Sequence, residues 1–82
     1  LTMIDKIEIK KHIYNHFSLE KNFIFDNETR PSDVPGWDSL GWMSLIVSLE
    51  SNYNVRYNFS IFDNVETVYD FITAIKGFHE QL

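Results

Sequence analysis

The chain has 82 residues, no cysteine and a formal net charge of −5, and 44% of its residues are apolar or aromatic. This length predicts one domain over residues 1–82, and the lack of cysteine excludes disulfides and thiolate metal sites. Seven Lys and Arg residues spread along an acidic chain do not form the cationic stripe of a nucleic-acid-binding protein. We find neither an apolar run of about 18 residues nor a basic, apolar leader, so we expect no membrane span, no secretory signal and a cytoplasmic location.

The first periodic segment predicts a helix over residues 3–17. Ile9 fits its apolar face poorly, whereas five other apolar residues share that face: Ile4, Ile7, Ile13, Tyr14 and Phe17. Residues 18–37 are rich in turn residues and predict a long loop. The apolar run 23–25 should anchor this loop on the helices, so we expect it to be ordered.

A second helix is expected from Ser39 to Tyr53, about 22 Å long at 1.5 Å per residue. Its apolar stripe recurs at spacings of three and four: Met43, Ile46, Leu49 and Tyr53, with Leu45 alongside. Leu40 and Val47 lie off this stripe. They predict either a surface that faces a partner or the scattered apolar exposure that is normal on soluble proteins.

The last part of the chain predicts one short helical turn and a third long helix. The turn should span Phe59 to Asp63. Thr67 and Asp70 match a capping box at the start of the last helix, which we expect to fray at Gly77. The predicted fold class is therefore all-α, with three main helices, one short helix and a long first loop.

The stretch 36–41, Gly-Trp-Asp-Ser-Leu-Gly, lies where the loop meets the second helix. Asp38 can act as the N-cap residue, which leaves the hydroxyl of Ser39 free for chemistry. A phosphate attached there would meet free backbone N–H groups and the positive end of the helix dipole. The alternative interpretation is that Asp-Ser is only a helix start signal.

Together these residues resemble the acyl carrier protein family, the carriers that bear a phosphopantetheine arm. The resemblance covers nearly the whole chain. It rests on Gly36, Asp38, Ser39 and Leu40, then on Leu49, Glu50, Tyr53, Val55, Tyr57, Thr67 and Val68.

The resemblance implies a small four-helix bundle of acyl-carrier type that acts as a monomeric carrier and not as an enzyme. A phosphopantetheinyl transferase would attach 4'-phosphopantetheine from coenzyme A to Ser39. The arm would hold acyl or aminoacyl groups as thioesters for a loading enzyme and for downstream transferases or synthases. Asp38, Leu40, Trp42 and Val47 would take part in partner recognition, although a position in the core is an equally good interpretation of Trp42.

The chain departs from fatty-acid carriers, which have several acidic residues along the second helix. Residues 41–49 carry no charge, and Glu50 stands alone near the end of the helix. This argues against a role in housekeeping fatty-acid synthesis. The run 37–41, Trp-Asp-Ser-Leu-Gly, is more similar to discrete carriers of specialised pathways, such as aminoacyl, polyketide-like or cell-surface glycan chemistry. Gly41 costs a helix about 1 kcal/mol relative to alanine, which the close approach of the arm or of a partner would explain.

Parts of the sequence are also compatible with three other functions. The stretch 36–41 is not a Gly-x-Ser-x-Gly nucleophile elbow, so hydrolysis is disfavoured. His12 and His16, with Glu8 one turn earlier, could face one metal ion, but histidines on a lysine-bearing helix are more often solvated. The strongest rival is a helical interaction module that binds a partner and is never modified.

Overall fold

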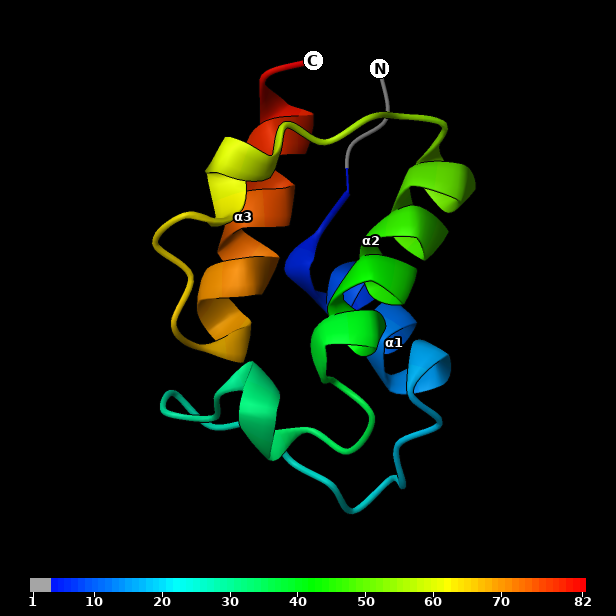
Figure 1. Ribbon diagram of the computed structural model, residues 1–82, viewed down its shortest axis with the longest axis vertical. Coiled ribbons are helices and arrows are strands. Elements are labelled where there is room, and N and C mark those ends of the chain that lie inside the picture. The colour runs from blue at the N-terminus through cyan, green and yellow to red at the C-terminus, as the bar shows by residue number, and fades with distance from the viewer. Residues whose placement is uncertain (1–3) are drawn as a thin grey trace.

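The computed structural model describes residues 4–82, and the regular elements of this part of the chain are all helices (Figure 1). It contains three α-helices and two 3-10 helices: α1 (Lys6–His16), η1 (Pro31–Asp33), α2 (Ser39–Tyr53), η2 (Phe59–Phe62) and α3 (Val68–Glu80). The predicted small all-α bundle with three main helices and one short helix is confirmed, and η1 is an addition. Met3, where the first helix was expected to begin, lies outside the described residues.

The long loop lies at one end of the bundle, where both α2 and α3 begin (Figure 1). From this end α2 and α3 both run to the opposite end of the bundle, where the C-terminus lies. The helix α1 packs against both of them, and η2 packs on α3. None of the helices in residues 4–82 is long and apolar enough to cross a membrane. The first turn of α2 is thus placed next to the loop, at an end of the molecule.

Side-chain caps determine where the helices begin. The Oδ1 atom of Asp5 accepts a hydrogen bond from the backbone N–H of Glu8 (2.8 Å), so α1 begins at Lys6 and not at residue 3. The predicted capping box of α3 is confirmed, because Thr67 and Asp70 accept from each other's backbone N–H groups at 3.1 and 3.0 Å.

The expected fraying of α3 at Gly77 is wrong, since the helix continues to Glu80. The half-buried side chain of Phe78 and the fully buried one of His79 hold this last turn against the core. Their burial offsets the low helix propensity of glycine.

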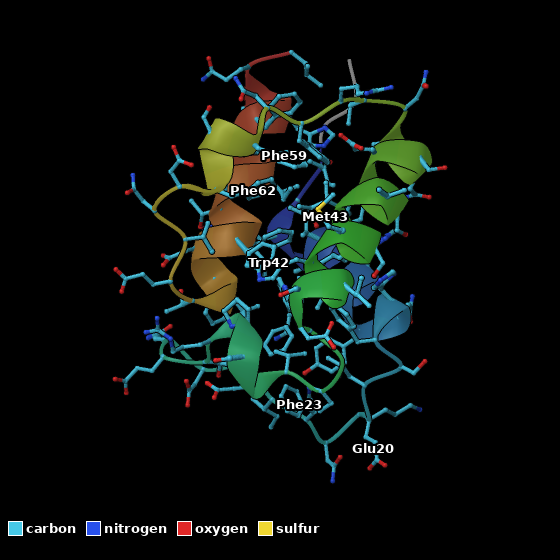
Figure 2. All side chains as sticks on the ribbon, in the orientation of Figure 1. Glu20, Phe23, Trp42, Met43, Phe59 and Phe62 are labelled. Carbon is cyan, nitrogen blue, oxygen red and sulfur yellow. The ribbon has the colours of Figure 1, made fainter. Side chains whose placement is uncertain are left out.

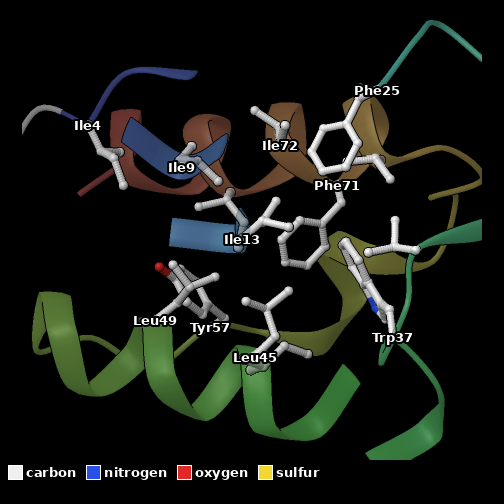
Figure 3. Close-up of a cluster of buried hydrophobic side chains, with 14 residues drawn as sticks. Ile4, Ile9, Ile13, Phe25, Trp37, Leu45, Leu49, Tyr57, Phe71 and Ile72 are labelled. Atoms are coloured by element: carbon white, nitrogen blue, oxygen red, sulfur yellow. The ribbon is translucent and has the colours of Figure 1, made fainter. Parts of the chain in front are cut away.

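The core lies between the three helices, and Figure 3 shows its largest buried side chains. Ile9 and Ile13 of α1 are fully buried, whereas Ile7 is 67% exposed. The predicted apolar face of the first helix was therefore wrong at Ile7, which was expected on it, and at Ile9, which was expected to fit it poorly. Ile7 and Ile9 both lie in the first turn of α1, so two apolar stripes are possible, and the one formed by Ile9 and Ile13 at i, i+4 spacing faces α2 and α3.

The predicted apolar stripe of α2 also needs a correction. Leu45 is fully buried at the centre of the bundle, whereas Met43, which was expected on the core stripe, is 47% exposed. Ile46 and Leu49 are buried as predicted. Met43 thus belongs to the outer surface of α2.

The loop is packed on the helices, as predicted. Phe25 is buried and its ring lies 5.1 Å from that of Tyr14. The Tyr14 hydroxyl donates to the carbonyl of Phe23, and the N–H of Val68 donates to the carbonyl of Thr29 at 2.8 Å. Ile24, in the middle of the expected anchor, is 75% exposed, so the anchor is formed by Phe25 and the half-buried Phe23.

Candidate functional site

The loop enters α2 through a tight turn at residues 34–37. The N–H of Trp37 donates to the carbonyl of Val34 at 3.0 Å, with Pro35 and Gly36 between them. Gly36 has a φ of 88°, a left-handed conformation that favours glycine at the third position of a type II turn. Gly36 thus turns the backbone toward the helix.

Trp37 anchors the end of the loop on the core. Its side chain is buried. Its ring stacks on that of Phe17, with centroids 5.4 Å apart, and meets the ring of Phe71 nearly at a right angle, with centroids 5.1 Å apart. Its Nε1 has no hydrogen-bond partner within residues 4–82. Because this large aromatic side chain is held on several sides, the backbone of the next residue, Asp38, is also held in place.

Asp38 is the N-cap residue of α2, as the sequence predicted. Its backbone is extended, and its Oδ1 atom accepts from the N–H of Gly41 at 2.8 Å. Its backbone carbonyl accepts from the N–H of Trp42 at 2.8 Å. One aspartate therefore satisfies the third and fourth N–H groups of the helix.

Ser39 is the first residue of α2 and is exposed. Its hydroxyl makes no hydrogen bond to any other residue in the described part of the chain, because Asp38 has taken the capping role. The N–H groups of Ser39 and Leu40, the first two of the helix, also find no partner within residues 4–82. The site thus joins a free nucleophilic oxygen to two open donors at the positive end of a helix dipole.

Gly41 is required by the turn beneath it. A Cβ atom at this position would overlap the carbonyl oxygen of Gly36 and would lie 3.1 Å from the ring of Phe17. The sequence analysis explained this glycine by the approach of an arm or a partner, and that explanation is wrong. The close approach comes from the chain's own backbone.

An apolar surface extends along α2 from Ser39. Leu40 is 82% exposed and Val47 is 55% exposed, so both predicted recognition residues face outward. Met43 and Phe59 are also exposed, and sequence reasoning did not place them in the site. Figure 2 shows Met43 on α2 and Phe59 at η2, and the rings of Trp42 and Phe62 link these two elements, with centroids 6.1 Å apart. We call Leu40, Met43, Val47 and Phe59 the apolar face.

Trp42 occupies a different position from the other predicted recognition residues. Its half-buried ring packs against Trp37 at 5.2 Å, Phe71 at 5.5 Å and Phe62 at 6.1 Å. It joins α2 to α3 and η2 below the apolar face. Any contact with a partner would involve only the part of the ring that remains exposed.

The histidines of α1 do not converge with Glu8. The Nε2 atoms of His12 and His16 lie 3.0 and 2.8 Å from the hydroxyls of Ser48 and Ser44, so they link α1 to α2. Glu8 instead accepts from the hydroxyl of Tyr53 at 2.6 Å. No group of three potential metal ligands occurs within residues 4–82.

His79 lies far from the site, in the last turn of α3, at the opposite end of that helix from the loop. It is buried, and its Nε2 atom lies 2.7 Å from the hydroxyl of Tyr57. Burial lowers its pKa, an effect that the carboxylate of Glu8 opposes more weakly. His79 is therefore a neutral core residue and not a base for Ser39.

Comparisons with known proteins identify no relative of this chain: no family model, no curated protein and no solved structure matches it.

Proposed function

We propose that Ser39 carries a 4'-phosphopantetheine arm and that the chain is a discrete carrier of acyl or aminoacyl thioesters. In this proposal the helices form a bundle of acyl-carrier type. The observation that carries it is the exposed hydroxyl of Ser39 on the first residue of α2, freed from capping by Asp38. An attachment point needs this combination of exposure and a fixed position on a rigid element.

The surroundings of Ser39 suit a phosphodiester. In the modification, the hydroxyl oxygen would attack the phosphorus nearest the pantetheine in coenzyme A. A new P–O bond would form to Ser39 as the bond to the nucleotide phosphate breaks, and a base of the transferase would take the hydroxyl proton. The open N–H groups of Ser39 and Leu40 and the helix dipole favour the negative charge that remains.

Asp38 has a carboxylate oxygen that the cap does not use. Only Oδ1 is engaged by the N–H of Gly41, and the residue is exposed. Oδ2 is thus available for the cationic or Mg²⁺-bearing site of a transferase. This assigns Asp38 two roles, one to each oxygen.

The apolar face supports a particular kind of partner. No charged residue lies between Asp38 and Glu50, so docking along α2 would depend on burial of Leu40, Met43, Val47 and Phe59 more than on ion pairs. The loading enzyme and the downstream transferases or synthases would share this surface. Such docking fits a specialised pathway better than housekeeping fatty-acid synthesis.

The test is transfer of a labelled arm. The protein is incubated with a fluorescent coenzyme A conjugate, Mg²⁺ and a phosphopantetheinyl transferase of broad specificity, and fluorescence is followed on a denaturing gel. We expect labelling of the wild type, equal labelling of Ser51→Ala and none of Ser39→Ala. Ser51 is an exposed serine of the same helix and so a matched control.

The second candidate is an interaction module that is never modified, and the exposed apolar face is the observation that favours it. It predicts no labelling of a folded wild-type protein, because its function needs only the surface and not the hydroxyl. The labelling experiment therefore separates the two functions.

A further inference from the structure

A hollow of about 560 Å³ lies on the outer side of α1, away from the apolar face. Six residues line it: Ile7, Lys10, Lys11, Tyr14, Asn15 and Lys21. None of them belongs to α2 or takes part in the site at Ser39. We call it the α1 hollow.

The charge of the α1 hollow is opposite to that of the chain. Three of the seven Lys and Arg residues line it and none of its lining residues is acidic, although the chain carries a net charge of −5. The acidic residues of α1 and its cap are engaged elsewhere. Glu8 accepts from Tyr53 of α2, and Asp5 caps the helix. The α1 hollow is therefore a locally positive surface on an acidic protein.

The floor of the α1 hollow is apolar. Ile7 is 67% exposed there, and the alkyl stems of the lysines add hydrocarbon around it. Tyr14 contributes its ring, because its hydroxyl is held by the carbonyl of Phe23. Nothing within residues 4–82 covers Ile7.

We propose that the α1 hollow binds an acidic segment of a partner protein, with one apolar side chain over Ile7 and carboxylates facing Lys10, Lys11 and Lys21. Charge complementarity gives such a contact its specificity and its rate of association. A nucleic acid is disfavoured, because three cations release few counterions. An anionic membrane is disfavoured, because the remaining surface is acidic and would be repelled.

The test uses a short amidated peptide in which one leucine is flanked by glutamates and aspartates. Binding to the isotope-labelled protein is followed through backbone amide chemical shifts at low salt. We expect the shifts to cluster at residues 7–21. A peptide with lysines in place of the acids, and vesicles of phosphatidylcholine with phosphatidylserine, should produce none.

Two charge-reversal variants provide the decisive comparison. Lys11→Glu/Lys21→Glu should weaken peptide binding at least tenfold, whereas Arg30→Glu/Arg56→Glu should change it less than twofold. All four side chains are exposed, and both variants change the net charge equally. Ile7→Ser should weaken binding several-fold.

Equal weakening by the two double variants would overturn the proposal, because only the overall charge would then matter. So would the absence of shifts, shifts confined to the apolar face, or binding of the vesicles. Labelling of Ser39 should proceed in all these variants as in the wild type, so the outcome is independent of the carrier proposal.

Discussion

The carbonyl of Gly36 occupies the space that a side chain of Gly41 would need. The turn at residues 34–37 and the first turn of α2 are thereby packed backbone to backbone. This contact fixes the position of Ser39 relative to the loop. Both glycines are needed, Gly36 for its positive φ and Gly41 for its lack of a Cβ atom.

Gly41→Ala should therefore destabilise the fold by about 1–3 kcal/mol, the usual cost of forcing atoms into a packed site. Gly77→Ala is the matched control, because a Cβ atom there meets nothing within 4 Å. That variant should gain up to about 1 kcal/mol from helix propensity. Urea denaturation measures both, and equal effects of the two substitutions would contradict the backbone contact.

The two roles of Asp38 can be separated by substitution. Asparagine is as good an N-cap residue as aspartate, so Asp38→Asn should keep the stability within a few tenths of a kcal/mol. It removes the charge, and we expect the rate of transfer to Ser39 to fall at least tenfold. Thr67→Ala should show the opposite pattern, with about 1 kcal/mol of stability lost and the rate unchanged. A normal rate in Asp38→Asn would restrict Asp38 to capping.

Removal of side chains from the apolar face should impair partner reactions and not folding. Leu40→Ser and Val47→Ser should each lower kcat/KM of the transferase about tenfold, a loss of about 1.4 kcal/mol of binding energy. Ile24→Ser is the control, since Ile24 is also exposed but lies in the loop. Surface substitutions of this kind change stability by about 0.5 kcal/mol or less.

The same face predicts a weak dependence on salt. No charged side chain lies between Asp38 and Glu50, so screening removes little of the docking energy. The kcat/KM of transfer should change less than threefold between 50 and 500 mM NaCl. A loss of tenfold or more would show that ion pairs dominate docking.

Stability should fall below neutral pH because His79 is buried and His12 is half-buried. Burial lowers the pKa of His79 and of His12, so the unfolded chain binds protons more readily than the folded one. The full stability is present above a pH of about 6.5, the ordinary pKa of histidine, and is lost as the pH decreases through and below it. Urea denaturation at pH 7.5 and pH 5 measures the effect. Unchanged or higher stability at pH 5 would contradict it.

Local signals made the elements near the site predictable from the sequence. The bounds of α2 were predicted correctly, because Asp38 caps its start and the left-handed Asn54 ends it. The capping box of α3 and the exposure of Leu40 and Val47 were predicted from local patterns as well.

Tertiary contacts decided the features that were missed. The sequence alone could not choose between Ile7 and Ile9, since either stripe makes an amphipathic helix. The reason for Gly41 depends on a turn five residues earlier, and the exposure of Met43 and Phe59 depends on how η2 lies beside α2. None of these relationships has a local signal.

The most direct measurement of the central claim is the intact mass of the protein after incubation with coenzyme A, Mg²⁺ and the transferase, followed by fragmentation. We predict a gain of one phosphopantetheine unit that maps to Ser39 and is absent in Ser39→Ala. No gain in mass from a folded wild-type protein, or a gain that maps to another residue, would contradict the proposal that Ser39 is the attachment site.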